Sequence, residues 1–135
     1  MSNTVFSDPQ EVENAFYKAF ETADLNAMMQ VWLDADYVEC IHPMSHRLMG
    51  LAAIRESWRE IFNNNANVEF DTVETRCIEH TDLAIHIVNE HLLVNGSKRI
   101  QILATNIYEK TPAGWRMILH HASPAPREAE PAILH

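Results

Sequence analysis

The amino-acid sequence predicts an α+β fold in which helices come first and an antiparallel sheet follows. Apolar residues recur with helical spacing in three early segments, at residues 9–23, 25–32 and 51–62. The second half of the chain instead predicts four long strands separated by short turns, at residues 68–79, 83–94, 98–109 and 115–122. A run of helices followed by a run of strands is typical of proteins in which helices cover one face of an antiparallel sheet.

Capping residues mark where two of the helices begin. Asp8 precedes Pro9, which predicts an N-cap followed by a proline at the first helical position. Asp24 predicts the cap of the second helix. Between the second and third helices, residues 37–42 alternate between polar and apolar as a short strand, which Pro43 ends.

The dipeptide Asn95-Gly96 predicts a two-residue hairpin turn that pairs Val94 with Ser97. With this register, we expect the more apolar face of the hairpin to meet the helices. That face comprises Leu83, Ile85, Ile87, Asn89, His91, Leu93, Ile100, Ile102, Ala104, Asn106 and Tyr108. The opposite face is mixed and comprises His86, Val88, Glu90, Leu92, Arg99, Gln101, Leu103, Thr105 and Ile107. Because this second face is too apolar to be fully solvated, it predicts a homodimer interface.

The composition fits one domain and limits the classes of partner. We expect a single domain over residues 1–125 and a loosely held, proline-containing tail over residues 126–135. The formal net charge of −9 argues against nucleic-acid binding and against binding to an anionic membrane, because no basic patch is left to neutralise phosphates. The sequence has neither an apolar run long enough to span a bilayer nor an N-terminal signal, so we expect a cytoplasmic protein.

The spacing of cysteines and histidines predicts no metal site and no cofactor. Cys40 and Cys77 match no metal-binding spacing, and both lie in predicted strands beside aliphatic residues, so we expect buried, reduced thiols that react slowly. Pro43 prevents the helix that would align His42 with His46 as two ligands. A site made by His42, His91 and His121 remains geometrically open as an alternative.

The order of these elements resembles a known superfamily. The resemblance extends over nearly the whole chain and rests on residues 15–20, 24–25, 31–32, 36–38, 40–43, 50–54, 58, 114–116 and 120–124. These segments are similar to the nuclear transport factor two-like superfamily, in its ketosteroid isomerase-like and SnoaL-like branch. The resemblance implies a cone-shaped, cystatin-like fold in which three helices pack on a curved, mainly antiparallel sheet around a pocket. It also implies a homodimer through the convex sheet face.

The resemblance implies candidate catalytic residues. Tyr17 is similar in position to the helix-one tyrosine that serves the isomerases as an oxyanion donor. Their general base is a strand aspartate next to a proline; here His42 precedes Pro43, and an ungapped match places Cys40 at the aspartate's position. A histidine has an unperturbed pKa of about 6.5, which suits proton transfer near neutral pH. The alternative is that His42 only bonds a backbone group at the end of a strand.

We expect Tyr17 and His42 to share a pocket with side chains from the other elements. The candidates are Trp58, Asn106, His91, His120 and His121. The last strand places one imidazole of the His120-His121 pair on each face, and its register leaves open which one points inward. The expected function is binding of a small, largely apolar molecule, with acid–base isomerisation, cyclisation or dehydration by His42 and Tyr17. The alternative is a non-catalytic ligand-binding or assembly module of the same fold.

Overall fold

The computed structural model describes residues 4–126, and within that range three helices and six strands follow one another along the chain. In order they are α1 (Pro9–Thr22), α2 (Leu25–Val31), β1 (Glu39–Ile41), β2 (Arg47–Met49), α3 (Leu51–Phe62), β3 (Val68–Glu79), β4 (Leu83–Val94), β5 (Lys98–Thr111) and β6 (Gly114–Pro124). The predicted α+β class and all three predicted helices are confirmed. The short strand β2 was not predicted.

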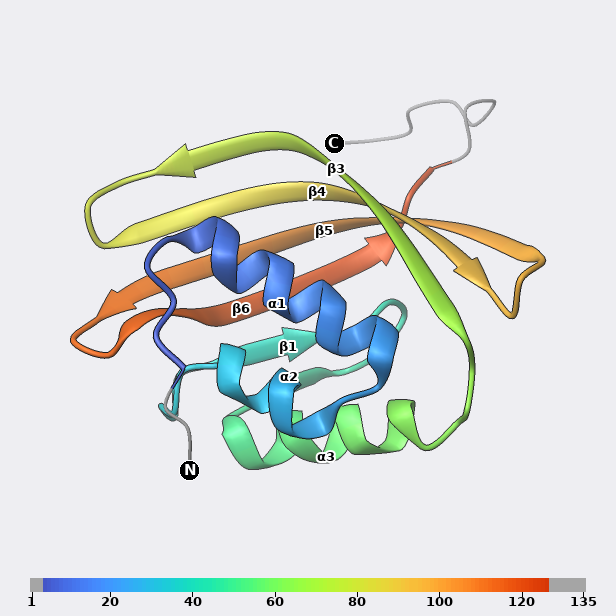
Figure 1. Ribbon diagram of the computed structural model, residues 1–135, viewed down its shortest axis with the longest axis horizontal. Coiled ribbons are helices and arrows are strands. Elements are labelled where there is room, and N and C mark those ends of the chain that lie inside the picture. The colour runs from blue at the N-terminus through green and yellow to red at the C-terminus, as the bar shows by residue number, and fades with distance from the viewer. Residues whose placement is uncertain (1–3, 127–135) are drawn as a thin grey trace.

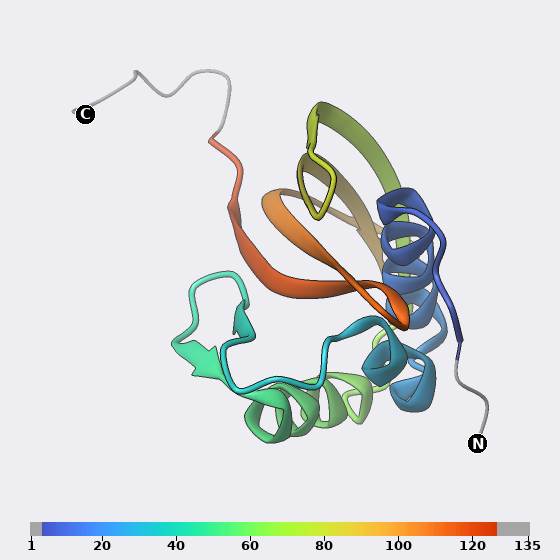
Figure 2. The same cartoon turned by 90° about the vertical axis from the view of Figure 1, so that its left-hand side faces the viewer.

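One curved sheet contains all six strands, in the order β2-β1-β6-β5-β4-β3. Neighbouring strands are antiparallel except β1 and β6, which run parallel. The helix α1 crosses the concave face of the sheet, and α2 and α3 lie toward the end that carries β1 (Figure 1). Seen along the sheet, the long strands curl over the helices (Figure 2). The predicted arrangement of helices on a curved, mainly antiparallel sheet is therefore confirmed.

Side-chain hydrogen bonds begin the first two helices. The side chain of Asp8 accepts from the backbone N–H of Glu11 at 2.8 Å, and that of Asp24 accepts from Ala27 at 3.0 Å. Each of these bonds satisfies one of the donors that a helix leaves unpaired at its N-terminus. Ala23 ends α1 in the left-handed conformation, with φ of 51°, and so turns the chain directly into α2.

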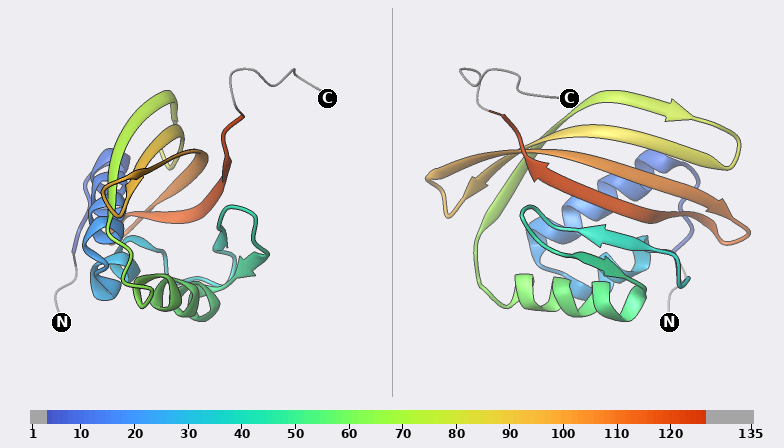
Figure 3. Two further views of the ribbon diagram at one scale, coloured as in Figure 1. Left: turned by 90° about the vertical axis from the view of Figure 1, so that its right-hand side faces the viewer. Right: turned by 180° about the vertical axis from the view of Figure 1, so that it is seen from behind.

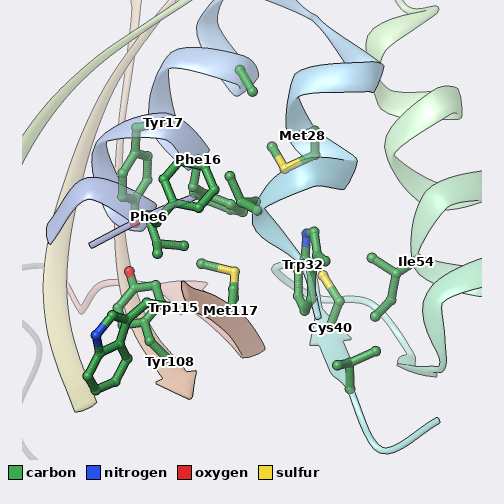
Figure 4. Close-up of a cluster of buried hydrophobic side chains, with 14 of the residues drawn as sticks. Phe6, Phe16, Tyr17, Met28, Trp32, Cys40, Ile54, Tyr108, Trp115 and Met117 are labelled. Carbon is green, nitrogen blue, oxygen red and sulfur yellow. The ribbon is translucent and has the colours of Figure 1, made fainter. Parts of the chain in front are cut away.

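The hydrophobic core lies between the three helices and the concave side of the sheet. Figure 4 shows Phe16 from α1, Met28 from α2, Ile54 from α3 and Met117 from β6 converging there, and all four are fully buried. Trp58 from α3 is also fully buried, with its ring 5.5 Å from that of Phe16 in an edge-to-face contact. Burial of large aromatic and aliphatic side chains at this junction is the main force that holds α3 against the rest of the fold.

The register of the β4–β5 hairpin differs by one residue from the prediction. Val94 pairs with Lys98, so the loop has three residues instead of two. Asn95 exchanges hydrogen bonds with Asn67 at the start of β3: its backbone N–H donates to the Asn67 carbonyl and its side-chain oxygen accepts from the Asn67 N–H. Asn67 is distant from the hairpin in the sequence. The turn preference of Asn95-Gly96, which depends on neighbouring residues alone, therefore could not reveal this contact.

The shift of one residue turns every side chain of β4 to the other face of the sheet. The concave face therefore carries Ala84, His86, Val88 and Glu90, all of which are buried. On β5 the predicted inward residues Ile102, Ala104, Asn106 and Tyr108 do point inward. His91 was predicted to lie on the same face as Asn106, and this was wrong, because His91 is exposed on the opposite face from Glu90.

The two cysteines differ in exposure. Cys40 is fully buried, as predicted, whereas Cys77 is exposed, so the prediction of a buried thiol was wrong there. Within residues 4–126 no helix is both long and apolar enough to cross a membrane. The tail predicted over residues 126–135 lies outside the described residues except for its first residue, so that expectation stays a prediction.

Candidate functional site

A cavity of about 340 Å³ lies on the concave side of the sheet, bounded by α1, α3 and strands β4, β5 and β6. Its lining residues are Phe20, His42, Pro43, Ile61, Glu90, Leu92, Ile100, Ile102, His120, Ala122 and Pro124. Most of these are apolar, and three of them, His42, Glu90 and His120, can exchange protons. An apolar cavity with a few convergent polar groups is the usual form of a small-molecule site.

Two larger hollows of about 690 Å³ lie elsewhere on the molecule. One borders α3 and the loop after β1, and His42 lines it as well as the cavity. The other lies at the hairpin end of β3, β4 and β5, and His91 lines it. Neither of these two hollows is lined by Glu90 or His120, so the smaller cavity is the better candidate for chemistry.

A chain of hydrogen bonds connects the cavity wall to the interior. The hydroxyl of Tyr17 on α1 donates to Oε2 of Glu90 at 2.6 Å. The same hydroxyl accepts from Nδ2 of Asn106 at 3.1 Å, and Oδ1 of Asn106 lies 2.6 Å from Nδ1 of His120. All four residues are buried, and a buried polar network with every member bonded is rigid. The network therefore holds Glu90 and His120 in place at the cavity.

The same network determines which nitrogen of His120 is basic. Because Nδ2 of Asn106 donates to Tyr17, its carbonyl oxygen is the atom that faces His120. An amide oxygen only accepts, so Nδ1 of His120 must carry the proton. Nε2 of His120 then holds the lone pair, on a residue that lines the cavity.

His42 is oriented from α3. Ser57 donates its hydroxyl hydrogen to the carbonyl of Ile54 at 2.7 Å, so its oxygen accepts from Nε2 of His42, 3.0 Å away. Nδ1 of His42 is therefore the basic nitrogen. The indole of Trp58 packs edge-to-face against the imidazole with the ring centres 4.7 Å apart, which limits rotation of the ring. His42 is thus a positioned base at the junction of the cavity and the hollow beside α3.

Burial determines the charges of the three ionisable groups in the cavity, His42, His120 and Glu90. Desolvation lowers the pKa of His42 to about 4, and desolvation with the neighbouring His42 and His121 lowers the pKa of His120 to about 3. Both imidazoles are neutral near pH 7. Desolvation raises the pKa of Glu90 to about 7, against the opposing effect of the hydrogen bond from Tyr17. Near neutral pH the cavity therefore contains two neutral bases and one carboxyl group that can donate a proton.

The structure brings together Tyr17, His42, Trp58, Asn106 and His120 among the predicted site residues, whereas His91 and His121 are exposed on the other face of the sheet. Tyr17, Asn106 and His120 form the buried network, and His42 lines the cavity with His120. Tyr17 does not line the cavity. It borders a different groove, and its hydroxyl hydrogen is bonded to the carboxyl group of Glu90. Trp58 is fully buried beside His42 as part of the core.

The register of β6 decides between the two adjacent histidines. His120 is opposite Asn106 and is buried, whereas His121 is opposite Thr105 and is exposed. A bulge between the Leu119 and Met117 pairings shifts the strand by one residue. Without that bulge, the alternation that buries Trp115 and Met117 would have turned His121 inward.

Sequence reasoning missed the acid in the site. A two-residue hairpin turn predicts Glu90 on the outer face of the sheet, whereas the three-residue loop places it on the concave face. Its neighbours Val88 and Leu92 are apolar and share its face, and a carboxylate inside such a stripe is itself a signal of a functional group. Ser57, which orients His42, is half-buried at the edge of the apolar stripe of α3, and nothing in the helical pattern singled it out.

A second buried polar group lies one turn earlier on α1. Oε1 of Glu13 is 3.0 Å from Nδ1 of His86 and accepts from the hydroxyl of Tyr108 at 3.0 Å. Burial by itself would lower the pKa of His86, but the surrounding carboxylates outweigh it and raise that pKa. Burial would likewise raise the pKa of Glu13, but the hydrogen bond from His86 leads the opposing effects and lowers it. Glu13 and His86 therefore form an ion pair.

Comparison with known proteins identifies relatives over almost the whole chain. The SnoaL-like domain family matches residues 10–128. A structure from Thiobacillus denitrificans, provisionally described as a calcium/calmodulin-dependent protein kinase type II association domain, is 41% identical with a TM-score of 0.87, and the match covers 91% of this chain and 99% of that one. A structure from Streptomyces avermitilis, provisionally described as a dehydratase of the NTF2-like family, is 29% identical with a TM-score of 0.79, over 86% and 92% of the two chains.

One curated protein is also similar. F-box protein SKIP8 from Arabidopsis thaliana is 31% identical over 126 residues, which is 92% of this chain and 52% of SKIP8. The chain therefore spans about half the length of this relative. More distant structures described as having a cystatin-like fold share the architecture alone.

Proposed function

The chain belongs to the SnoaL-like domain family, within the NTF2-like superfamily, and on that premise we propose that it binds a small, largely apolar molecule in the 340 Å³ cavity and transfers a proton on it. The observation that carries the proposal is the juxtaposition of Glu90 with His42 and His120 in an otherwise apolar lining. A proton donor and a base on one cavity are the minimum for isomerisation or dehydration. The volume is at the lower end of the range of ligand sites, which favours a small substrate.

The geometry suggests separate roles for the polar groups. His42, through Nδ1, is the proposed base, and the protonated carboxyl of Glu90 is the proposed acid. Tyr17 is a positioning residue, because it holds Glu90 and does not line the cavity. This assignment replaces the pair of His42 and Tyr17 with the pair of His42 and Glu90.

A dehydration can be written with these groups and no others. His42 takes a proton from the carbon next to a substrate carbonyl, and the electron pair of that C–H bond forms a new C=C bond. The C–O bond to a β-hydroxyl breaks, and Glu90 gives its proton to the departing oxygen, which leaves as water. His42 is then protonated and Glu90 ionised, and a proton passes between them through solvent to restore the starting state. The similarity to the Streptomyces avermitilis structure described provisionally as a dehydratase supports this class of reaction.

The second candidate is a non-catalytic binding or assembly module. The similarity to the Thiobacillus denitrificans structure described provisionally as an association domain favours it. In that case the cavity binds a ligand or a peptide segment, and its histidines only provide hydrogen bonds. Both candidates use the same cavity, so proton transfer is the property that separates them.

The first experiment tests binding. Native mass spectrometry of protein purified without added ligand is expected to detect a retained small molecule in the wild type. Ala122→Phe should remove it, because Ala122 lines the cavity and a phenyl ring fills space there. Ala52→Phe is the matched control, because Ala52 is exposed on α3 outside the cavity lining and the same change there should leave retention unchanged. Equal retention by both variants would contradict a ligand in this cavity.

The second experiment tests catalysis on the retained molecule. Incubation in D₂O should place deuterium on a substrate carbon with wild-type protein, and His42→Ala should abolish this exchange. The melting temperature should change little, because Ser57 keeps its bond to Ile54 when the imidazole is removed. Retention of the molecule without exchange in the wild type would favour the binding module instead.

We also propose that the outer face of the sheet joins two copies of the chain. Figure 3 (right) shows the sheet from behind, with the helices on its far side. Val73, Leu83 and Leu103 lie on the outer face with 51%, 38% and 37% of their surfaces exposed. Burial of such a surface against its own symmetry mate is the commonest way to form a dimer. Leu103→Lys should convert a dimer to a monomer in sedimentation, and a wild-type monomer at micromolar concentration would overturn the proposal.

A further inference from the structure

A group of metal-binding side chains lies at the β3 edge of the sheet, away from the residues that line the cavity. One ligand atom from each of Glu74, Cys77 and His86 falls within 4.8 Å of the others. The thiol of Cys77 donates to Oε2 of Glu74 at 3.1 Å, and the same oxygen is 3.1 Å from Nδ1 of His86. The carboxylate of Glu74 therefore contacts both the thiol of Cys77 and the imidazole of His86.

A β-bulge creates this grouping. Glu74 and Cys77 are three residues apart, and in a regular strand they would point to opposite faces. The register of β3 shifts between Glu74 and Arg76, so Glu74 pairs with Val88 while Cys77 pairs with His86. Both side chains are thereby on the face of β4 that carries His86. The hydroxyl of Thr75, the residue inside the bulge, donates to the carbonyl of Ile87 at 3.0 Å and holds the bulge in place. Bulges are frequent where a strand must re-aim a side chain.

His86 gives an independent indication of a missing partner. Only 1% of its side chain is exposed, and Nε2 has no hydrogen-bond partner among the described residues. The nearest carboxylate to Nε2 is that of Glu79, 3.6 Å away. The opposite nitrogen, Nδ1, lies 3.0 Å from Oε1 of Glu13, which in turn accepts from Tyr108, and 3.1 Å from Oε2 of Glu74. A histidine held through one nitrogen by a buried carboxylate, with the other nitrogen unpaired, has the arrangement found in metal sites.

We propose that Glu74, Cys77 and His86 bind a divalent metal ion of the zinc type, with Glu79 as a fourth ligand. Thiolate, imidazole and carboxylate are the ligands that Zn²⁺ uses in proteins, whereas Mg²⁺ and Ca²⁺ require oxygen ligands. Binding replaces the proton of the Cys77 thiol and the proton of His86. The acidic side chains around the group supply the negative charge that stabilises the cation. Spacing along the sequence did not suggest this site, because its histidine comes from the neighbouring strand.

The proposed site is independent of the proposed function of the cavity. It joins β3 to β4, and through Glu13 it supports α1, so its direct consequence is a more stable sheet edge. Metal that binds only the folded state raises the melting temperature by mass action. The site could therefore exist whether or not the cavity is catalytic.

Co²⁺ is a suitable probe because it takes the place of Zn²⁺ and its absorption reports ligands. Titration of tag-free, reduced protein with CoCl₂ should give a one-to-one complex with a near-ultraviolet band from thiolate coordination, and ZnCl₂ should displace it. Cys77→Ser should remove the thiolate band, and Glu74→Gln should weaken binding at least tenfold. Circular dichroism should show that both variants stay folded, because both altered residues are at the surface.

Two control variants lie outside the site. Cys40→Ala removes the other thiol and should keep the band. Glu69→Gln makes the same change of charge on the same strand, but Glu69 pairs with Leu93 on the outer face, so affinity should stay within twofold of wild type. Absence of a thiolate band in the wild type would overturn the proposal, as would equal weakening by Glu69→Gln and Glu74→Gln.

Discussion

Two buried pairs link α1 to β4, and they differ in charge although they are almost equally buried. Tyr17 contacts Glu90, and one helical turn earlier Glu13 contacts His86. The carboxyl-bearing residues are 3% and 2% exposed, yet burial raises the pKa of Glu90 to about 7 while the pKa of Glu13 is lowered. The partner makes the difference: a phenol supplies one hydrogen bond, whereas an imidazolium supplies a hydrogen bond and a charge. Burial alone therefore does not determine whether an interior carboxyl group is ionised.

Because of this difference in charge, we infer a structural role for the pair of Glu13 and His86 and a role in proton transfer for Glu90, which Tyr17 holds in place. The ion pair of Glu13 and His86 is closed by Tyr108 and belongs to the packing of α1 on the sheet. Glu90 instead uses one oxygen for Tyr17 and lines a cavity, so its proton is available to a ligand. The following experiments test this comparison in metal-free buffer with a chelator.

The largest expected effect comes from removing the charge of each carboxylate in turn. Glu13→Gln should lower the free energy of unfolding at pH 6 by about 2–3 kcal/mol, because His86 loses its most buried carboxylate partner and keeps only the more exposed Glu74 and Glu79. Glu90→Gln should change it by about 1 kcal/mol or less at pH 6, where Glu90 is already mostly neutral. Urea unfolding monitored by circular dichroism measures both. Equal losses in the two variants would mean that the two carboxyl groups do not differ in charge.

The next effect is the pH dependence of stability that the raised pKa of Glu90 contributes. Its folded pKa of about 7 is above the unfolded value of about 4.3, so the folded state binds more protons and stability falls as pH rises between these values. A shift of one pKa unit corresponds to about 1.4 kcal/mol. The free energy of unfolding of Glu90→Gln, relative to that of wild type, should therefore rise by about 2–3 kcal/mol from pH 5 to pH 8. Parallel stability profiles of the two proteins would contradict a raised pKa.

His42 and His120 change the stability of the fold in the same pH range, but in the direction opposite to Glu90. Their folded pKa values of about 4 and about 3 are below the unfolded value of about 6.5, so they destabilise the fold as pH falls below 6.5. Both histidines are present in wild type and in Glu90→Gln. The difference between these two proteins therefore isolates the carboxyl group.

A smaller effect distinguishes the two buried tyrosines. Tyr17→Phe removes the donor to Glu90 and the acceptor for Asn106, and should cost about 1–3 kcal/mol. It should also raise the pKa of Glu90 further above 7, because the hydrogen bond from Tyr17 lowers it. Tyr108→Phe is the matched control: it removes a donor to Glu13 and should leave Glu90 unchanged. Carbon-13 NMR titration of the glutamate carboxyl groups gives the readout, and equal shifts would place Tyr17 outside the Glu90 site.

The smallest expected effect is on the reactivity of the two thiols, and it is measured as a rate of modification and not as a change in stability. Burial raises the pKa of Cys40 to about 12, and desolvation with the hydrogen bond to Glu74 raises the pKa of the exposed Cys77 to about 12. Iodoacetamide should therefore modify Cys77 slowly at pH 8 and leave Cys40 unmodified in the native state. Glu74→Gln should speed the reaction at Cys77, and Glu69→Gln should not. Rapid labelling of Cys40 would show that the core around β1 opens.

The sequence by itself determined the parts of this protein that depend on local interactions. The caps at Asp8 and Asp24 begin helices through hydrogen bonds to residues three positions later, so they can be identified from neighbouring residues. Periodicity identified all three helices and the inward face of β5. His42 and Tyr17 were identified as site residues through the resemblance to the ketosteroid isomerase-like branch.

Only the tertiary structure decided which polar side chains of the sheet meet the cavity. Glu90 points inward because Asn95 bonds Asn67 and lengthens the hairpin loop by one residue. His120 points inward because β6 contains a bulge, and Cys77 approaches His86 because β3 contains another. Side chains alternate with a period of two, so a single extra residue reverses every face beyond it. Pairing between distant segments sets that residue, and for this reason the helices were predictable while the acid of the site was not.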